Sequence, residues 1–430
     1  MNRINLRKFP YPFQSALTIC SDIDGTPFKS FLEIHKFLNS DKNTSLGKGL
    51  ELPIGDSFWM YDKSYLPNSA FSYFKGYSNV ESDYAPIIRE LIQAGIIDVM
   101  HGYGNFNLSN QFSRRLAEQA VNELDKRNLK LFTWTNHGGA ENFQNIGRQS
   151  FGKGDQKDQN EYYHADLLKD YGITFYWDSE ALVSNIVGQD RDNSFVEAYF
   201  NNPLFRGHKQ NIKQMIKGLL SVYDALHYKL KKQYKFIWSE ANSDNRLLTQ
   251  DTLQDGTDLL KFKRFGHGRY DWSEDFSMLT NEHVLNKLVQ KEGYLILYIH
   301  FGDRKVKTDK ILTDSTIQSL KRIKEFYRSG KIWVDTTSNL LSYNRIHSNL
   351  HWSVEESEFY YLIIIDSLAE NYGTHKEIEK YLAGITFIVP LDKDVKIICN
   401  NHELTYRSAI VNNHKLVYFP LKKIEWPLNI

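Results

Sequence analysis

The sequence has little cysteine and no long apolar run. Cys20 and Cys399 are the only cysteines among 430 residues, and they lie far apart. This sparse use suits a reducing compartment or a fold that is indifferent to redox state, and neither cysteine is placed like a metal ligand. The longest apolar stretches, such as Tyr294–Ile299 and Tyr360–Ile365, are far too short to cross a bilayer. We therefore expect no transmembrane segment.

An excess of positive charge and a secretory signal are also missing. Lysine and arginine total 53 against 52 for aspartate and glutamate, which argues against a nucleic-acid partner or an anionic membrane surface. The first residues reach Pro10 and Pro12 without the apolar run of a signal peptide. We expect a cytoplasmic protein, and the sequence does not predict an oligomeric state.

The composition and pattern that are present predict an ordinary folded α/β protein. Hydrophobic residues make up 41% and charged residues 24% of the chain. To about residue 345, short β-branched or aromatic runs alternate with helix-period segments, a pattern typical of βα units with a parallel sheet. We predict a (β/α) barrel over residues 1–345, for which a distorted, seven-stranded form is one option, and a small all-β module over residues 346–430.

The predicted elements follow from this pattern. Helices are expected at 113–127 and 314–328, and a long polar loop at 143–160. The strands expected in the barrel are Ala16–Cys20, Ile97–Met100, Lys130–Thr133, Ile173–Tyr176, Lys235–Trp238, Leu259–Arg264, Tyr294–Ile299 and Ile332–Val334. The strands expected in the module are Tyr360–Ile365, Ile385–Val389, Val395–Cys399, Ser408–Val411 and Lys415–Phe419.

Two carboxylates follow the first predicted strand. Asp22 and Asp24 are two residues apart, so in extended backbone both side chains face the same way. Two like charges this close are costly unless a metal neutralises them or one carries a proton. The pair therefore indicates a cation site or an acid/base function. The alternative is that both carboxylates cap the loop or face water.

Histidines follow several further strands, each beside glycine. His101 precedes Gly102, His137 precedes two glycines, and His267 and His300 lie in similar turns. Imidazole and carboxylate together suit zinc or a similar divalent ion, although a histidine in a turn is more often a structural hydrogen-bonding group. His137 suits either metal ligation or hydrogen bonding to an oxyanion.

Other polar groups near these turns are candidates for contacts with substrate. Asn105 follows the His101 turn and Asn136 precedes His137. Arg264 and His267 lie in one glycine-containing turn. A rim of strands that presents such groups is what a polar hydrolytic site needs.

The order of these turns resembles the motifs of the polysaccharide deacetylase family. The strand end with Asp22 and Asp24, the His101 turn and the His300 strand end are similar to the first, second and last motifs. The resemblance spans residues 14 to 345 in layout and is specific only at these short stretches. It implies that Asp24 and His101 bind a divalent metal ion, with zinc expected, that Asp22 is the catalytic base, and that His300 acts as an acid or orients the substrate.

The sequence departs from the family pattern at three places. Asn105 stands where family members usually carry a second histidine, and Ile23 separates two aspartates that are usually adjacent, so their roles can be exchanged. The usual arginine-proline motif is replaced by Thr135 to Gly138. Either His137 supplies the missing ligand or the metal is lost.

The resemblance implies metal-dependent removal of the N-acetyl group from an acylated amino sugar, in an intracellular glycan precursor because no export signal is visible. Two alternatives stay open. One is a glycoside hydrolase, in which Asp22 or Asp24 works with Glu240 or Asp178. The other is a barrel that binds glycans without catalysis. An aromatic content of 14% suits a core as well as contacts with sugars.

Overall fold

The computed structural model describes most of the chain. The described residues are 4–63, 71–106, 111–138, 142–147, 152–178, 187–190, 246–266, 272–303, 310–367, 379 and 381–427. The predicted strand Lys235–Trp238 and the candidate residues Glu240 and His267 lie outside them.

The larger sheet carries four of the eight strands predicted for the barrel. Its neighbouring strands are parallel except for the antiparallel hairpin β10–β11 at one edge. In spatial order the seven strands are β10 (Leu248–Thr252), β11 (Asp258–Phe262), β9 (Phe175–Trp177), β8 (Thr133–Thr135), β7 (Ile97–His101), β5 (Asp56–Asp62) and β6 (Ser72–Lys75).

A second, three-stranded parallel sheet holds the first strand of the fold. Here β2 (Ser15–Ser21) lies between β12 (Tyr294–Ile299) and β13 (Ile332–Val334). The two sheets approach each other where Phe265, after β11, bridges in parallel to Leu297 of β12. The mixed α/β class is therefore observed. Because the described strands predicted for the barrel lie in two separate hydrogen-bonded sheets, closure into a (β/α) barrel stays a prediction.

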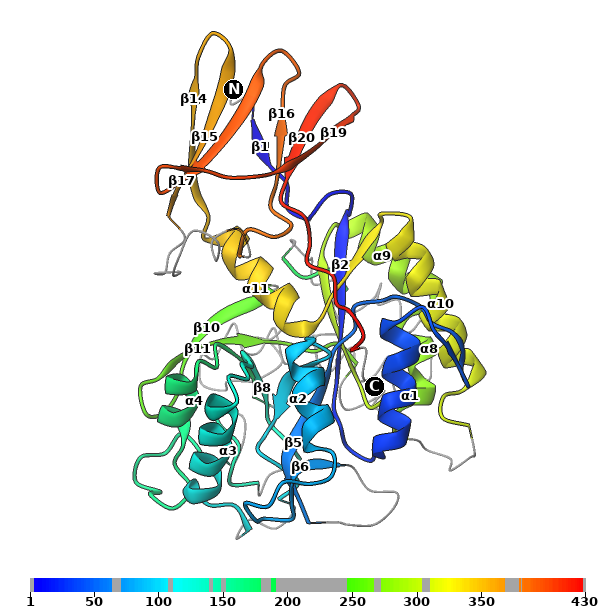
Figure 1. Ribbon diagram of the computed structural model, residues 1–430, viewed down its shortest axis with the longest axis vertical. Helices are drawn as coiled ribbons and strands as arrows, with labels where there is room; N and C mark the ends of the chain where they lie inside the picture. Colours follow the sequence, from blue (N-terminus) through cyan, green and yellow to red (C-terminus); the bar gives the residue numbers. More distant parts are fainter. Residues whose placement is uncertain are drawn as a thin grey trace, which may run out of the picture.

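Helices pack on the outer faces of these sheets (Figure 1). Leu17 and Ile19 of β2 lie in the same apolar cluster as residues of α1, α9 and α10, whereas Ala16 and Cys20 belong to a second cluster. This alternation follows the period of two of a strand. The helices are α1 (Phe28–Asn39), α2 (Ala85–Gln93), α3 (Arg114–Lys126), α4 (Ala165–Tyr171), α8 (Phe276–Leu279), α9 (Glu282–Lys291), α10 (Asp314–Arg328) and α11 (Thr337–Ser348).

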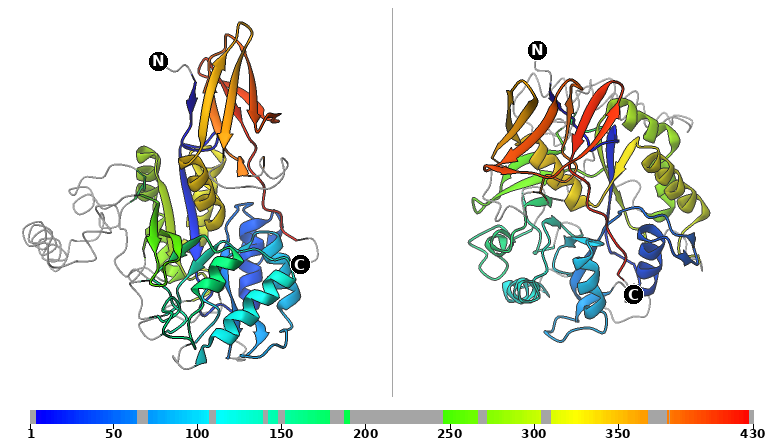
Figure 2. Two further views of the ribbon diagram at one scale, coloured as in Figure 1. Left: turned by 90° about the vertical axis from the view of Figure 1, so that its left-hand side faces the viewer. Right: turned by 45° about the horizontal axis from the view of Figure 1, so that its top comes forward.

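A β-rich module follows α11 and stands above the α/β part (Figures 1 and 2). The five strands predicted from the sequence are present with small changes at their ends. One sheet contains β14 (His351–Glu356), β15 (Tyr360–Ser367), β17 (Asp394–Cys399) and β18 (His402–Glu403). The other contains β1 (Asn5–Leu6), β16 (Thr386–Val389), β20 (His414–Tyr418) and β19 (Arg407–Val411).

The N-terminal strand β1 joins this module although it precedes the α/β part in sequence. Asn5 pairs with Ile388 and Leu6 with Phe387. One apolar cluster then runs from Ile4 and Phe387 in the module to Ala16 and Ile296 in the three-stranded sheet. The module and the α/β part therefore share a continuous core, and the predicted boundary between residues 345 and 346 stays a prediction.

Several predicted boundaries need correction. The strand expected at Lys130–Thr133 is β8, Thr133–Thr135, and the strand expected at Ile173–Tyr176 is β9, Phe175–Trp177. Ser113 stands at the N-cap of α3, but its side chain makes no capping hydrogen bond. In the described part of the chain, none of the helices is both long and apolar enough to cross a membrane. Short strands β3 (Asn43–Thr44) and β4 (Gly47–Lys48) form a small hairpin.

Candidate functional site

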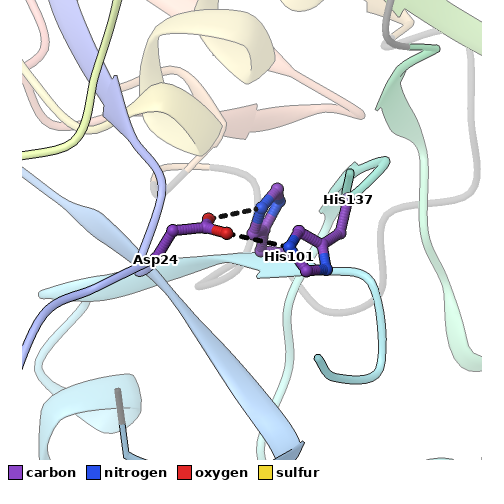
Figure 3. Close-up of side chains that lie close together, drawn as sticks. All are labelled: Asp24, His101 and His137. Atoms are coloured by element: carbon purple, nitrogen blue, oxygen red, sulfur yellow. Dashed lines mark hydrogen bonds and ion pairs between the residues drawn. The ribbon is translucent and has the colours of Figure 1, made fainter. Parts of the chain in front are cut away.

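Asp24 lies at the centre of a cluster of histidines (Figure 3). Its Oδ2 is 3.0 Å from Nε2 of His101, and its Oδ1 is 2.8 Å from Nε2 of His137. Asp24 follows β2, His101 ends β7, and His137 follows β8. Because β7 and β8 are parallel neighbours, their carboxyl ends lie at one edge of the sheet and bring the two imidazoles together.

The surroundings hold both imidazole rings in place. Nδ1 of His101 is 2.7 Å from Oγ1 of Thr135, so this ring nitrogen is occupied and Nε2 faces Asp24. The backbone N–H of His137 donates to Oδ1 of Asn145 at 3.0 Å. The indole of Trp59 stacks near His101, with ring centroids 6.1 Å apart, and packs against His137 at 4.9 Å. The donor atoms are therefore oriented before any ligand arrives.

Neighbouring charges and burial shift the pKa values of Asp24 and His137 in opposite directions. Burial alone would raise the pKa of Asp24, but the neighbouring His137 and His101 outweigh it and hold this pKa well below its usual value. Burial alone would lower the pKa of His137, but the Asp24 carboxylate outweighs it and raises this pKa. Asp24 is thus an ionised carboxylate that faces two imidazole nitrogens.

The donor set of Asp24, His101 and His137 fits a divalent metal ion. One donor atom from each of the three residues lies within 4.8 Å of the others, as bonds to a shared ion require. Two imidazole nitrogens and one carboxylate oxygen are a common ligand set for zinc in catalytic sites. The contact between His101 and Thr135 is the type of second hydrogen bond that orients a metal-bound histidine.

Asp22 has a different partner from Asp24. Its Oδ1 and Oδ2 accept hydrogen bonds from the two terminal nitrogens of Arg264 at 2.7 and 2.9 Å. The guanidinium also lies 3.6 Å from the ring centroid of Trp177 and 4.2 Å from that of Tyr298. Burial would raise the pKa of Asp22, but Arg264, and then His101, more than offset it, so this pKa is lowered.

His300 reaches the same cluster from β12. Its Nε2 is 3.6 Å from Oδ2 of Asp24 and 3.3 Å from the hydroxyl of Tyr298. Asp22, Asp24 and His300 form a second group whose donor atoms lie within 4.8 Å of one another. The structure thus brings together the strand ends that carry Asp24, His101, His137 and His300, as the sequence predicted.

The residues predicted to bind substrate differ in burial and in hydrogen-bond partners. Arg264 is 1% exposed and engages Asp22, and Asn136 is fully buried. The Asn136 amide accepts from Trp134 and Ile146 and donates to the Ile146 carbonyl, so its hydrogen bonds brace the loop after β8. Asn105 is partly buried, and its side-chain amide donates to Oδ1 of Asp62 at 3.4 Å. Arg264 and Asn136 therefore support the site from inside the fold, and a contact of either side chain with substrate stays a prediction.

One residue of the glycoside-hydrolase alternative can also be placed. Asp178 is 1% exposed, and its Oδ2 lies 3.5 Å from Nζ of Lys261. A carboxylate in this position is paired inside the fold. Its proposed partner Glu240 lies outside the described residues.

The structure adds supporting residues that sequence reasoning missed. Gln144 accepts from the backbone of Tyr103 and Gly104 and donates to the Gly104 carbonyl, which fixes the loop after His101. Trp59 belongs to β5, a strand that the sequence did not predict. The polar composition of 143–160 predicted a loop, but no local signal indicates which of its side chains point into the fold.

No family model, curated protein or solved structure matches the chain.

Proposed function

We propose that the chain is a metal-dependent hydrolase that removes the acyl group from an N-acylated amino sugar. The observation that carries this proposal is the convergence of Asp24, His101 and His137, with Asp22 and His300 beside them. Asp24, His101 and His137 would hold the ion. The bound ion would polarise the amide carbonyl and lower the pKa of a water molecule.

The other residues have separate roles in the proposed reaction. Arg264 keeps Asp22 ionised, and Asp22 accepts a proton from the attacking water. A carboxylate has lone pairs beyond the two that Arg264 occupies, so proton transfer remains open to it. Water adds to the acyl carbon and the carbon–nitrogen bond breaks. His300 donates a proton to the leaving amine nitrogen, which gives a free amino sugar and a carboxylate.

The geometry favours Asp24 over Asp22 as the metal ligand. Asp24 has one oxygen directed at each imidazole, whereas both oxygens of Asp22 are bonded to Arg264. His137 supplies the second histidine that the family pattern has at the position of Asn105. These contacts support the resemblance to the deacetylase family at the level of the site.

Acetate release from N-acetylglucosamine oligomers tests the proposal. We expect release that a chelator stops and added Zn²⁺ restores. Asp22→Asn should lose at least about a hundredfold in kcat, because general-base catalysis contributes on this scale. It is assayed at a temperature at which circular dichroism shows it folded, because the substitution leaves the buried Arg264 charge uncompensated. Asp83→Asn changes a carboxylate whose side chain is 88% exposed, and it should keep full activity.

The same assay separates the alternatives. Cleavage of the sugar chain without acetate release, unaffected by chelator, would identify a glycoside hydrolase and reject the deacetylase proposal. Binding of the oligomers with neither reaction would identify a glycan-binding protein, and it too would reject the proposal.

A further inference from the structure

Two aromatic side chains lie at the same end of the strands as the Asp24 cluster. Phe28 is the first residue of α1, and Tyr84 is the N-cap residue of α2. In the chain α1 follows β2, and α2 lies between β6 and β7, which are both parallel to β5 (Figure 1). Both helices therefore begin at the carboxyl ends of the strands, where Asp24 and His101 also lie.

The chain itself limits the distance between this aromatic pair and the candidate metal ligands. Phe28 follows Asp24 by four positions, so their Cα atoms are at most about 14 Å apart. The candidate site is also most open on this side. The side chains of Asp24 and His300 are 25% and 13% exposed, whereas those of His101 and His137 are 3% and 6% exposed. A short chain-like ligand bound over Asp24 can thus extend to Phe28.

The two aromatic rings form one continuous surface that the core supports. The ring centroids of Phe28 and Tyr84 are 4.3 Å apart, with 31° between the ring planes. Both rings stand edge-on to the buried ring of Phe71, at centroid distances of 5.0 and 6.2 Å. The backbone N–H of Tyr84 donates to Oγ of Ser82, and this hydroxyl donates to the Ser72 carbonyl at the start of β6. The pair is therefore held in one geometry before a ligand binds.

Tyr84 differs from the aromatic residues around it in its exposure. Phe31 and Phe71 are 0% and 3% exposed and belong to the core, and Phe28 is partly buried against that core. The side chain of Tyr84 is 40% exposed. An aromatic ring that is fixed at its base and open to solvent offers a flat apolar face to a ligand.

We propose that Phe28 and Tyr84 form a stacking subsite for a pyranose ring in the same sugar chain as the unit that is deacylated at Asp24. This inference rests on the proposed function and narrows its substrate class to oligosaccharides. A pyranose ring has an apolar C–H face that packs on an aromatic ring. A planar nucleobase is the weaker fit, because the two rings contact each other and leave no slot between them.

Calorimetric titration of the full chain with tetra-N-acetylchitotetraose tests the subsite, with a chelator present so that the oligomer is not turned over. Tyr84→Ala should weaken binding about tenfold, because one stacked ring is lost. Tyr84→Phe should restore the affinity, because a phenyl ring offers the same face. Phe132→Ala is the matched control, since Phe132 is 44% exposed but precedes β8, at the other end of the strands from Asp24.

Acetate release separates the subsite from the proposed reaction. The ratio of kcat/KM for the oligomer to kcat/KM for N-acetylglucosamine should fall about tenfold in Tyr84→Ala, because only the longer substrate extends to the pair. The change should appear in KM, since the pair binds the substrate away from the acyl carbon. Absence of acetate release with either substrate would reject the proposed function, and the calorimetric comparison would still decide whether the pair binds sugar.

Three results would overturn the proposal. The first is no binding of the oligomer to the unchanged chain. The second is equal affinity of Tyr84→Ala and the unchanged chain for the oligomer. The third is weaker binding of uridine diphosphate N-acetylglucosamine, but not of the oligomer, by Tyr84→Ala, which would place a nucleobase on the pair. The Tyr84 side chain makes no capping hydrogen bond to α2, so its variants are expected to fold, and circular dichroism checks this.

Discussion

At the scale of single residues, Asp24 divides its two oxygens between two imidazoles. Each histidine presents Nε2 to the carboxylate, and the Nδ1 of His101 is held by Thr135. The sequence indicated Asp24 and His101 as ligands but left open whether His137 joined them. That choice depends on how the loop after β8 turns, and the contacts of Asn145 with His137 set this turn.

Removing one histidine tests this ligand set. We expect the purified chain to contain close to one equivalent of zinc or a similar ion, and His101→Ala to lose most of it, because two remaining ligands hold a metal weakly. His137→Gln should lose it as well. His283→Gln lies on α9, away from the cluster, and should retain the metal. The metal content of each variant is measured by mass spectrometry. An unchanged metal content in His101→Ala would reject His101 as a ligand.

The pair of Asp22 and Arg264 predicts a large stability effect. Arg264→Met should lower the free energy of unfolding by about 3–5 kcal/mol at pH 7, because it leaves Asp22 as an uncompensated buried charge. Arg328→Met, which breaks the exposed pair with Glu51, should cost at most about 1 kcal/mol. Urea denaturation measures both. Equal losses in the two variants would contradict a buried ion pair at Asp22.

Asp98 predicts a pH-dependent contribution to stability. Burial, with Asp56 and Asp335 nearby, raises its pKa to about 7 although Ser338 donates to Oδ2. The folded state then binds a proton that the unfolded state, with a pKa near 3.8, has released. Stability from this group is therefore present at low pH and lost as pH rises toward 7.

Asp98→Asn isolates this effect. The free energy of unfolding of Asp98→Asn, relative to that of the unchanged chain, should rise between pH 4 and pH 8 by on the order of 4 kcal/mol, because the amide stays neutral. Denaturant titrations across this pH range give the difference. A difference that does not change with pH would show that Asp98 has the same pKa in both states.

At the scale of elements, strongly patterned segments were predictable from the sequence. β12, β13 and α10 have the expected bounds, because each is an apolar run or an amphipathic repeat bounded by turn residues. β5 was missed because its buried aromatic run shows no alternation and begins and ends with aspartate. β10 was missed because its sequence is polar and its strand character comes from pairing with β11.

The loop after β7 illustrates how tertiary contacts complete the site. Gly102 has a positive φ of 59°, and a Cβ there would lie 2.8 Å from the side chain of Gln144. Gln144 in turn bonds the backbone of Tyr103 and Gly104. No periodicity in the sequence links residue 144 to this loop, so the sequence predicted the turn but not what holds it.

Gln144→Ala should therefore affect the site through the loop. We expect a loss of about 1–3 kcal/mol in stability, because buried backbone groups lose their partner, and weaker metal binding at His101. Gln156→Ala removes one hydrogen bond to Gly152 in the same polar segment and is the control. Zinc affinity measured by competition with a chelator is the readout. Equal affinity in the two variants would show that Gln144 does not position His101.

At the scale of the whole molecule, the module and the α/β part share one apolar cluster. Ile4 and Phe387 in the module and Ile296 in the three-stranded sheet belong to it. The C-terminal segment returns to the α/β part as well, since Trp426 lies in the cluster that contains residues of α2 and α3. The sequence predicted the strands of the module but not this shared core, because such contacts join residues that are remote in the chain.

A shared core predicts cooperative unfolding. Scanning calorimetry should show a single thermal unfolding transition of the protein. Its calorimetric enthalpy should be close to the van't Hoff enthalpy. Phe387→Ala should lower the midpoint of that one transition, because it removes a large buried side chain from the shared cluster, at a cost of about 3–5 kcal/mol. Two resolved transitions, with only one shifted by the substitution, would contradict a continuous core.

The pairing of β1 with β16 also sets the order in which the protein can be completed during synthesis. Asn5 is translated well before its partner Ile388, because about 380 residues separate them in the chain. At about 5–20 residues per second, the first strand waits on the order of 20–80 s for its edge to be covered. Shielding this nascent segment from unwanted pairing is therefore a task for the cell before the native fold exists.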